Sequence, residues 1–200
     1  MLISITIPTC KTVVDITQQI NDIKATAITQ FELIYSCLPV SAAINRNKCL
    51  DQVTGDIVIQ LDDDITGFYK GWDTDLIQPL LSDPNISIVS ARLLDPNGSY
   101  GAMMHNNYIY TAGWHKPKAN FVPTACIAFR KMDLRFDEGY IRASFEDTDF
   151  CKQTELLFPE KYPVINNNCK LIHLNEMKFQ AGEAWDHNKA YFEKKWGVIC

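Results

Sequence analysis

An apolar run that ends in three consecutive acids constrains the fold of this chain more than any other feature of its sequence. The run is Asp56-Ile57-Val58-Ile59-Gln60-Leu61, and Asp62-Asp63-Asp64 follow it at once. Ile and Val fit a pleated sheet, and a strand that is apolar on both faces belongs in the buried middle of an α/β sheet. Adjacent carboxylates repel one another, and a divalent cation relieves that repulsion. The acids are therefore either a metal site at the carboxyl end of a strand, where open α/β sheets bind ligands, or a solvated acidic turn.

Length and composition predict one globular domain. The chain has 200 residues, which is enough for one sizeable core and short for two ordinary domains. Hydrophobic residues make up 46% and charged residues 22%, a balance that excludes disordered and fibrous proteins. The net charge of −5 gives no general attraction to nucleic acid or anionic lipid, so extended contact with either is not expected.

Cysteine usage and the N-terminus predict a cytoplasmic protein. The seven cysteines form no C-x-x-C pair and favour free thiols over a disulfide framework. Residues Met1 to Pro8 lack the basic and long apolar segments of an export signal. No stretch has the roughly 18 apolar residues that a transmembrane helix needs, so no transmembrane segment is predicted.

Strands and helices are expected to alternate along the first half of the chain. Thr12 is a candidate N-cap for a helix whose apolar face carries Val13, Ile16, Ile20 and Ile23, and Ser41 for a helix that Gly55 stops. The expected strands are Leu2–Ile7, Phe31–Tyr35 and Asp56–Leu61. This order predicts parallel pairing with right-handed crossovers, the nucleotide-binding half of a doubly wound sheet. The sequence has no G-x-G-x-x-G or P-loop pattern, which argues against dinucleotide and NTPase sites.

The second half has a less regular pattern. The expected elements are a helix capped by Asp73 that Pro79 kinks or ends, a strand over Ile86–Leu94, an irregular stretch over Ser99–Asn120, a strand over Thr124–Phe129, a helix over Glu146–Leu157, short strands over Tyr162–Ile165 and Cys169–Ile172, and a helix over Glu183–Trp196. Long irregular stretches are often functional. His105, Trp114 and His115 are candidates there for contact with a ligand, although ordinary loop residues are the preferred interpretation.

With those elements in order, the chain resembles the GT-A nucleotide-sugar glycosyltransferases, and glycosyltransferase family 2 most closely. The matching segments are the Arg-Asn helix segment Ala42–Asn47, the Gly55-Asp56 turn before the D-x-D acids Asp62–Asp64, the F-D-E segment Phe136–Glu138, the E-D-x-D segment Glu146–Asp149, a histidine at His173, and the C-terminal helix segment Tyr191–Gly197. The chain departs from the family at two places. Tyr35-Ser36-Cys37 stand where an acid commonly helps to bind the nucleotide base, and Leu134-Arg135 replace small glycines before F-D-E.

The resemblance implies a single GT-A domain over residues 1–200, with a Rossmann-like, mixed and mostly parallel sheet flanked by helices. Residues 1–98 are expected to bind nucleotide sugar and metal, and residues 99–200 to bind the acceptor and supply the base. The implied activity is that of a metal-dependent, inverting glycosyltransferase of the hexosyltransferase type. The implied nucleotide-sugar contacts are Pro8, Thr9, Arg46, Asp62 and Asp63, and the implied ligands of Mn²⁺ or Mg²⁺ are Asp62, Asp64 and His173.

Three of these roles have an ordinary alternative. Asp147 is the candidate base, with Glu146 orienting the acceptor or the base, but acids in the first turn of a helix are also favoured by the helix dipole. Arg46 is expected to pair with the diphosphate or the base, or else to form a surface ion pair. His173 is either a ligand or a histidine packed at the end of a strand.

The implied donor is a UDP-sugar, with a GDP-sugar as the second possibility. The hydroxyl acceptor stays open among glycan, lipid-linked, protein and modified-nucleic-acid acceptors. Two other classes of function stay open as well: a metal-dependent phosphoryl or nucleotidyl transferase, which also gathers acids around divalent ions, and a non-catalytic sugar-nucleotide-binding module. Leu174–Gly182 is predicted to close over the donor, because this segment contains a glycine and follows a candidate ligand.

Overall fold

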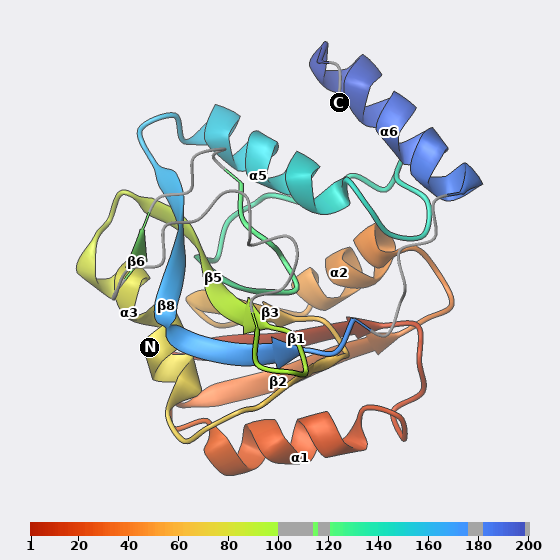
Figure 1. The fold of residues 1–200 in the computed structure, drawn as a ribbon. Helices are drawn as coiled ribbons and strands as arrows, with labels where there is room; N and C mark the ends of the chain where they lie inside the picture. Colours follow the sequence, from red (N-terminus) through yellow and green to blue (C-terminus); the bar gives the residue numbers. More distant parts are fainter. Residues whose placement is uncertain (100–113, 116–120, 176–181, 199–200) are drawn as a thin grey trace.

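A computed structural model describes residues 1–99, 114–115, 121–175 and 182–198 of the chain (Figure 1). Its strands are β1 (Ile3–Thr9), β2 (Phe31–Cys37), β3 (Ile57–Leu61), β4 (Ile65–Thr66), β5 (Ile86–Leu94), β6 (Trp114–His115), β7 (Cys126–Arg130) and β8 (Tyr162–His173). Its helices are α1 (Thr17–Thr26), α2 (Ala42–Leu50), α3 (Trp72–Ser82), α5 (Glu146–Leu157) and α6 (Glu183–Trp196).

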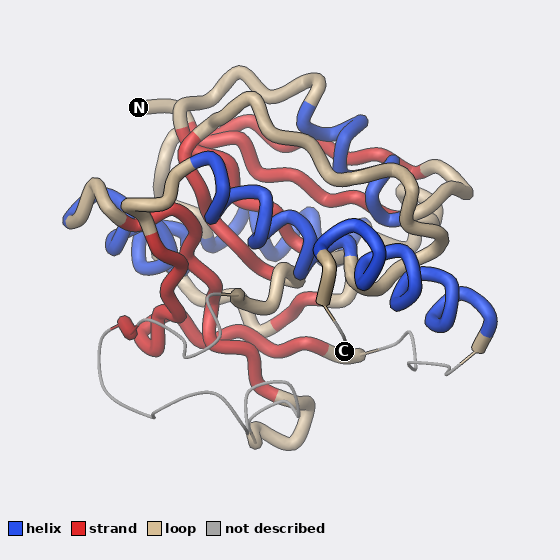
Figure 2. The backbone as a smooth tube through the Cα atoms, turned by 90° about the horizontal axis from the view of Figure 1, so that it is seen from above, coloured by secondary structure: helices blue, strands red, loops and turns tan. Residues whose placement is uncertain are grey.

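The strands form one mixed sheet in the order β2-β1-β3-β7-β5-β8-β4, with β6 beside β8. β1 pairs in parallel with β2 and β3, and β5 pairs in parallel with β8, while β7 lies antiparallel between β3 and β5. The strands β1, β2, β3, β5 and β8 therefore run in one direction, and β4, β6 and β7 run against them. α1 and α2 lie on opposite sides of the sheet (Figure 1), and two long helices lie in front of the strands in the view from above (Figure 2). The predicted α/β class, with a mostly parallel sheet flanked by helices, is confirmed.

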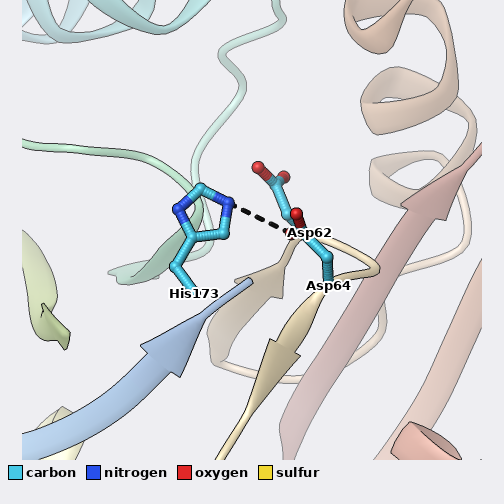
Figure 3. A group of neighbouring side chains, drawn as sticks. All are labelled: Asp62, Asp64 and His173. Atoms are coloured by element: carbon cyan, nitrogen blue, oxygen red, sulfur yellow. Dashed lines mark ion pairs between the residues drawn. The ribbon is translucent and has the colours of Figure 1, made fainter. Parts of the chain in front are cut away.

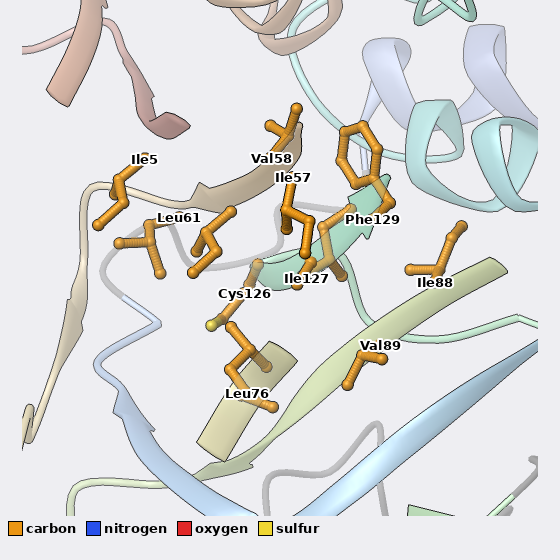
Figure 4. Close-up of a cluster of buried hydrophobic side chains, with 14 of the residues drawn as sticks. Ile5, Ile57, Val58, Leu61, Leu76, Ile88, Val89, Cys126, Ile127 and Phe129 are labelled. Carbon is orange, nitrogen blue, oxygen red and sulfur yellow. The ribbon is translucent and has the colours of Figure 1, made fainter. Parts of the chain in front are cut away.

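Branched apolar side chains fix the central strands. Ile3 and Ile5 of β1 stand beside Ile57 and Ile59 of β3, and all four are almost completely buried. Figure 4 shows Ile5 and Ile57 within this buried cluster. Burying a side chain of this size contributes about 1.5–3 kcal/mol, so a shift of β3 by one residue would lose several such contributions. The end of β3, where the three acids begin, is held in register by this core.

The start of two helices differs from the sequence prediction. Thr12 does not cap α1; its backbone N–H and its hydroxyl both donate to Asp15 Oδ2, at 2.9 and 2.8 Å, in a turn before the helix. Val13 is consequently 41% exposed, whereas Ile16, Ile20 and Ile23 are buried as expected. Asp73 does not cap α3 either, because the N-cap is Gly71. The fully buried Asp73 carboxylate instead accepts hydrogen bonds from the backbone N–H groups of Ile28 and Thr29.

Pro79 does not end α3, which continues to Ser82. A proline inside a helix leaves the carbonyl four residues earlier without its N–H partner. That carbonyl belongs to Asp75, and it accepts a 2.6 Å hydrogen bond from Asn166 Nδ2 of β8. Asn166 lies in the part of β8 where the register with β5 shifts, so the two short strands predicted around it form one irregular strand.

The short strand β4 was not predicted from the sequence. It follows Asp64 directly and pairs antiparallel with the end of β8, with Ile65 opposite His173. A two-residue strand has no periodic pattern of its own, so only this distant pairing defines it. Its consequence is that the acids after β3 and the histidine that ends β8 lie side by side.

Gly55, in the turn before β3, has no room for a side chain. A Cβ there would stand 2.7 Å from the Leu2 carbonyl oxygen and 2.8 Å from the Ser4 backbone nitrogen. We therefore expect Gly55→Ala to lower the free energy of unfolding by about 3 kcal/mol, measured by chemical denaturation.

Gly98→Ala is the matched control. A Cβ at Gly98 meets nothing within 4 Å, although its φ of +79° makes alanine strained. We expect this substitution to cost only about 1 kcal/mol. Equal losses for the two variants would contradict the close approach at Gly55.

Candidate active site

Three potential metal ligands meet at the carboxyl end of β3. Asp62, Asp64 and His173 each offer one ligand atom, and these atoms lie within 4.8 Å of one another (Figure 3). His173 Nε2 is 3.1 Å from Asp64 Oδ1. The structure thus brings together the three residues predicted as metal ligands. Two carboxylates and one imidazole form a donor set that suits Mn²⁺ at least as well as Mg²⁺.

The two titratable partners at this point have shifted pKa values. Burial raises the pKa of Asp62, and its pairing with Arg46 offsets only part of that rise. Burial lowers the pKa of His173, but hydrogen bonding to Asp64 and the charges of Asp64 and Asp62 raise it above its ordinary value. The carboxylates thus attract positive charge, which is the electrostatic condition for a cation site.

The backbone around Asp62 and Asp64 is held by partners from other elements. The Asp62 carbonyl accepts a 2.8 Å hydrogen bond from Gln19 Nε2 of α1, and the Asp62 N–H donates to the Ala125 carbonyl at 2.7 Å. The Asp64 carbonyl accepts from the Leu174 N–H at 3.0 Å. Gln19 was not among the predicted site residues, yet it fixes the first acid of the D-x-D segment.

The middle acid, Asp63, turns toward the end of β1. It accepts a hydrogen bond from the Thr9 hydroxyl, and its Oδ1 lies 3.1 Å from Lys11 Nζ. Pro8 is buried and stands beside Ser36 of β2 in the sheet. The predicted nucleotide-sugar residues Pro8, Thr9 and Asp63 therefore lie together, with Lys11 as an additional charge that the sequence analysis did not identify.

Arg46 joins the two halves of the site. Its Nη2 lies 3.0 Å from Asp62 Oδ1, and its Nη1 lies 2.6 Å from Glu146 Oε1 of α5. The side chain is 5% exposed, and its guanidinium lies 5.1 Å from the centre of the Phe136 ring. Burial lowers the pKa of Arg46, but the charges of Asp62 and Glu146 raise it by more than burial lowers it. The pKa is therefore above its ordinary value, and the guanidinium keeps its charge. Both contacts are ion pairs of a buried guanidinium with protein carboxylates and not the surface ion pair that was the ordinary alternative, while pairing with the diphosphate or the base stays a prediction.

Glu146 and Asp147, predicted as the orienting acid and the base, begin α5. Glu146 is buried, and its second oxygen accepts a 2.6 Å hydrogen bond from the Ser144 N–H. Burial raises the pKa of Glu146 more than Arg46 lowers it. Asp147 is half-buried and accepts a 2.7 Å hydrogen bond from the Thr148 N–H. The N-cap Phe145 contributes no side-chain cap bond among the described residues, so Asp147 itself satisfies one first-turn amide.

Comparison with known proteins finds a likeness in fold and none in sequence. No protein-family model matches the sequence, and no curated protein matches it significantly. Solved structures do match. TarS of S. aureus, a GT-A glycosyltransferase, matches with a TM-score of 0.69 and 13% identity, over 98% of this chain and 39% of TarS.

Two further structures contain ligands. TarS 1–349 in complex with UDP-GlcNAc matches with a TM-score of 0.60 and 15% identity, over 93% of this chain and 61% of that one. GalNAc-T7 with UDP, GalNAc and Mn²⁺ matches with a TM-score of 0.64 and 9% identity, over 98% of this chain and 50% of that one. The protein has a GT-A-like glycosyltransferase fold. This chain spans about two fifths of the length of TarS, and at these identities the likeness concerns the fold alone.

Within the GT-A-like fold, two residues of the sequence motifs form hydrogen bonds that stabilise the fold. Asn47 Oδ1 accepts a 2.9 Å hydrogen bond from the Phe136 N–H and so holds the F-D-E segment in place. Asp149, the last acid of E-D-x-D, is fully buried and accepts hydrogen bonds from Tyr140 Oη at 3.1 Å and Trp196 Nε1 at 2.7 Å. Asn47 and Asp149 therefore link segments of the fold that are far apart in the sequence.

Some predicted features lie outside the described part of the GT-A-like fold. These are His105, the side chains of Trp114 and His115, and residues 176–181 of the predicted lid. The helices that the structure describes include none long and apolar enough to cross a lipid bilayer.

The Arg46 bridge gives a stability prediction. Arg46→Met leaves Glu146, whose side chain is 4% exposed, as an uncompensated buried charge, so the free energy of unfolding should fall by about 3–5 kcal/mol. Adding Glu146→Gln should restore about half of that loss, because the 29% exposed Asp62 side chain keeps contact with water. Chemical denaturation of the two single variants and the double variant measures this coupling.

Lys189→Met is the control for the loss of a positive charge. Lys189 Nζ lies 3.9 Å from Glu193 Oε1 in a partly exposed pair on α6. Its removal should cost less than about 1 kcal/mol. An Arg46→Met loss as small as that of Lys189→Met, or no recovery in the double variant, would show that the bridge does not stabilise the fold.

Proposed function

We propose that the protein is a metal-dependent, inverting glycosyltransferase that moves a sugar from a nucleoside diphosphate sugar to an acceptor hydroxyl. The observation that carries this proposal is the meeting of Asp62, Asp64 and His173 at the carboxyl end of β3. The GT-A-like fold supports it, because two structural neighbours contain UDP-GlcNAc or UDP, GalNAc and Mn²⁺. A UDP-sugar is the first donor to test.

The proposed donor site is formed by residues from three strand ends. Asp62, Asp64 and His173 would hold Mn²⁺ or Mg²⁺, which when bound stabilises the charge that develops on the leaving diphosphate. Thr9, Asp63 and the neighbouring Pro8 would line the nucleoside side, where Lys11 adds a positive charge. Arg46 would act on this site by holding Asp62 in place through its 3.0 Å contact.

Asp147 is the proposed general base. In the transfer step the acceptor oxygen attacks the anomeric carbon, and the bond from that carbon to the diphosphate oxygen breaks. The hydroxyl proton passes to the Asp147 carboxylate, and the nucleoside diphosphate leaves with the electron pair of the broken bond. Attack opposite the leaving group inverts the anomeric centre. Glu146, paired with Arg46, would orient the base and not accept the proton, because its side chain is buried.

Product analysis separates this function from its two alternatives. Incubation with Mn²⁺ and UDP-GlcNAc should release UDP, slowly with water as the acceptor and faster with the natural acceptor. A nucleotidyl or phosphoryl transferase would release diphosphate or transfer the nucleotide instead. A binding module would show saturable binding of UDP-GlcNAc and no product over many hours.

Metal removal tests the proposed donor site. The diphosphate supplies ligand oxygens that complete the coordination, so UDP and Mn²⁺ should each strengthen the binding of the other. Titration calorimetry should show that EDTA or Asp64→Asn weakens UDP binding by about 10-fold or more. Asp133→Asn, at an acid whose side chain is fully exposed, should leave the affinity unchanged. UDP affinity that is insensitive to EDTA and to Asp64→Asn would overturn the metal bridge.

Asp147→Asn tests the proposed base. Asparagine keeps the shape but cannot accept a proton, so the single-turnover rate of UDP release should fall by about 10² to 10⁴ while UDP and Mn²⁺ affinities stay within a factor of two. If Asp147 served only as a helix-end acceptor, Asn would replace it well and both the melting temperature and the rate would be nearly unchanged. A near-normal rate would therefore exclude Asp147 as the base.

A further inference from the structure

The five residues before Glu146 have an unusual backbone conformation. Arg142, Ser144 and Phe145 have φ values of +55°, +112° and +65°, and none of them is glycine. Residues with a Cβ rarely adopt positive φ values, and a positive φ at a bulky residue such as Phe is a clear outlier. Such a backbone persists only where the surrounding structure holds it. The segment 141–145 leads directly into the acids at the start of α5.

One buried side chain of α6 holds this segment. Asn188 is fully buried, and its Oδ1 accepts a 2.9 Å hydrogen bond from the Ile141 N–H. Its Nδ2 donates to the Ile141 carbonyl at 2.8 Å and contacts the Ser144 carbonyl and hydroxyl oxygens, both at 3.1 Å. The acceptor and both donors of the amide can therefore be used by a segment more than forty residues away.

The far side of the same segment contacts the active site. The Ser144 N–H donates to Glu146 Oε2 at 2.6 Å, and Glu146 Oε1 pairs with Arg46. The Arg142 carbonyl accepts a 2.7 Å hydrogen bond from the N–H of Ala42, the first residue of the helix that carries Arg46. Segment 141–145 therefore lies between Asn188 and the acids that begin α5.

We infer that Asn188 is a positioning residue for Glu146 and Asp147. By fixing the left-handed turn at Ser144 and Phe145, it sets the direction in which α5 starts and thus where the Asp147 carboxylate points. This role rests on the proposed glycosyl transfer, in which Asp147 takes the proton. Attachment of α6 alone does not require it, because Lys195 and Trp196 bind the buried Asp149 at the other end of the helix. Among the described residues, the side-chain hydrogen bonds of Asn188 all go to this segment. A fully buried amide used in this way is better explained by a need for the geometry of the segment.

The experiment compares Asn188→Ala with Lys195→Met. Lys195→Met removes the 2.6 and 2.8 Å contacts of α6 to Asp137 and Asp149 and leaves segment 141–145 untouched. The first readout is independent of function: trypsin cleavage after the exposed Arg142. Asn188→Ala should raise this cleavage rate by about 10-fold or more, because the segment then opens without global unfolding, and Lys195→Met should not.

The second readout separates positioning from folding. With Mn²⁺ and UDP-GlcNAc, Asn188→Ala should lower kcat for UDP release by about 10- to 100-fold while KM stays within a factor of two, because a displaced base affects the reaction and not donor binding. The Lys195→Met variant should have the same kcat as the unmodified protein at any temperature at which the variant is folded. If Asn188→Ala does not fold, Asn188→Ser, whose hydroxyl retains one polar group at this position, is measured in the same way.

The outcomes distinguish the inference from the proposed function. Unchanged cleavage after Arg142 in the Asn188 variant contradicts the inference, and so does increased cleavage with normal kcat. Absence of UDP-GlcNAc binding and turnover in the unmodified protein counts against the proposed function, and the cleavage rates then decide whether Asn188 holds the segment.

Discussion

The contact of one buried guanidinium with two carboxylates is the interaction on which the site depends. Arg46 reaches Asp62 at the end of β3 and Glu146 at the start of α5, two residues that are far apart in the chain. Buried ions lose the solvation that water provides, and they persist only when their partners are placed well. The orientation of α2, the end of β3 and the start of α5 must therefore agree with one another. This agreement connects the D-x-D acids with the E-D-x-D acids across the sheet.

Two further contacts between segments that are distant in the sequence position the residues around the Arg46 bridge. The two-residue strand β4 brings His173 opposite Ile65 and so next to Asp64. The Asn188 amide of α6 holds the left-handed turn before Glu146. These three connections fix where Asp64 and His173, the Arg46 bridge and the start of α5 lie relative to one another. If the proposed function is correct, contacts of this kind lower the cost of orienting the reacting groups.

Sequence reasoning found the features that local patterns encode. The buried strand before Asp62, the helix capped by Ser41 and the order of the acidic motifs all follow from periodicity, capping and adjacency, and the structure contains them. The predicted meeting of Asp62, Asp64 and His173 depended on the family resemblance, because β4, which joins them, has no periodic pattern. The expected caps at Thr12 and Asp73 were wrong because each side chain forms other hydrogen bonds, for Asp73 with residues of the loop between α1 and β2.

Two of the missed residues, Gln19 and Asn188, are polar side chains on apolar helix faces. Gln19 falls between Ile16 and Ile23 on the buried side of α1, and Asn188 falls between Trp185 and Phe192 on α6. A lone amide within an apolar stripe predicts a buried hydrogen-bonded group, since an unpaired one would be costly. That signal was present in both helices. Its partners, the Asp62 carbonyl and segment 141–145, could not be identified before the tertiary structure was known.

The central claim is that Asp62, Asp64 and His173 hold a metal ion that also contacts the diphosphate of the donor. Pulsed electron paramagnetic resonance of the protein with Mn²⁺ and UDP tests this claim most directly. Coordination by these residues should give a ¹⁴N coupling from one imidazole that disappears in His173→Gln, together with a ³¹P coupling from the diphosphate. A bound Mn²⁺ with neither coupling, or a ¹⁴N coupling that survives in His173→Gln, would contradict it.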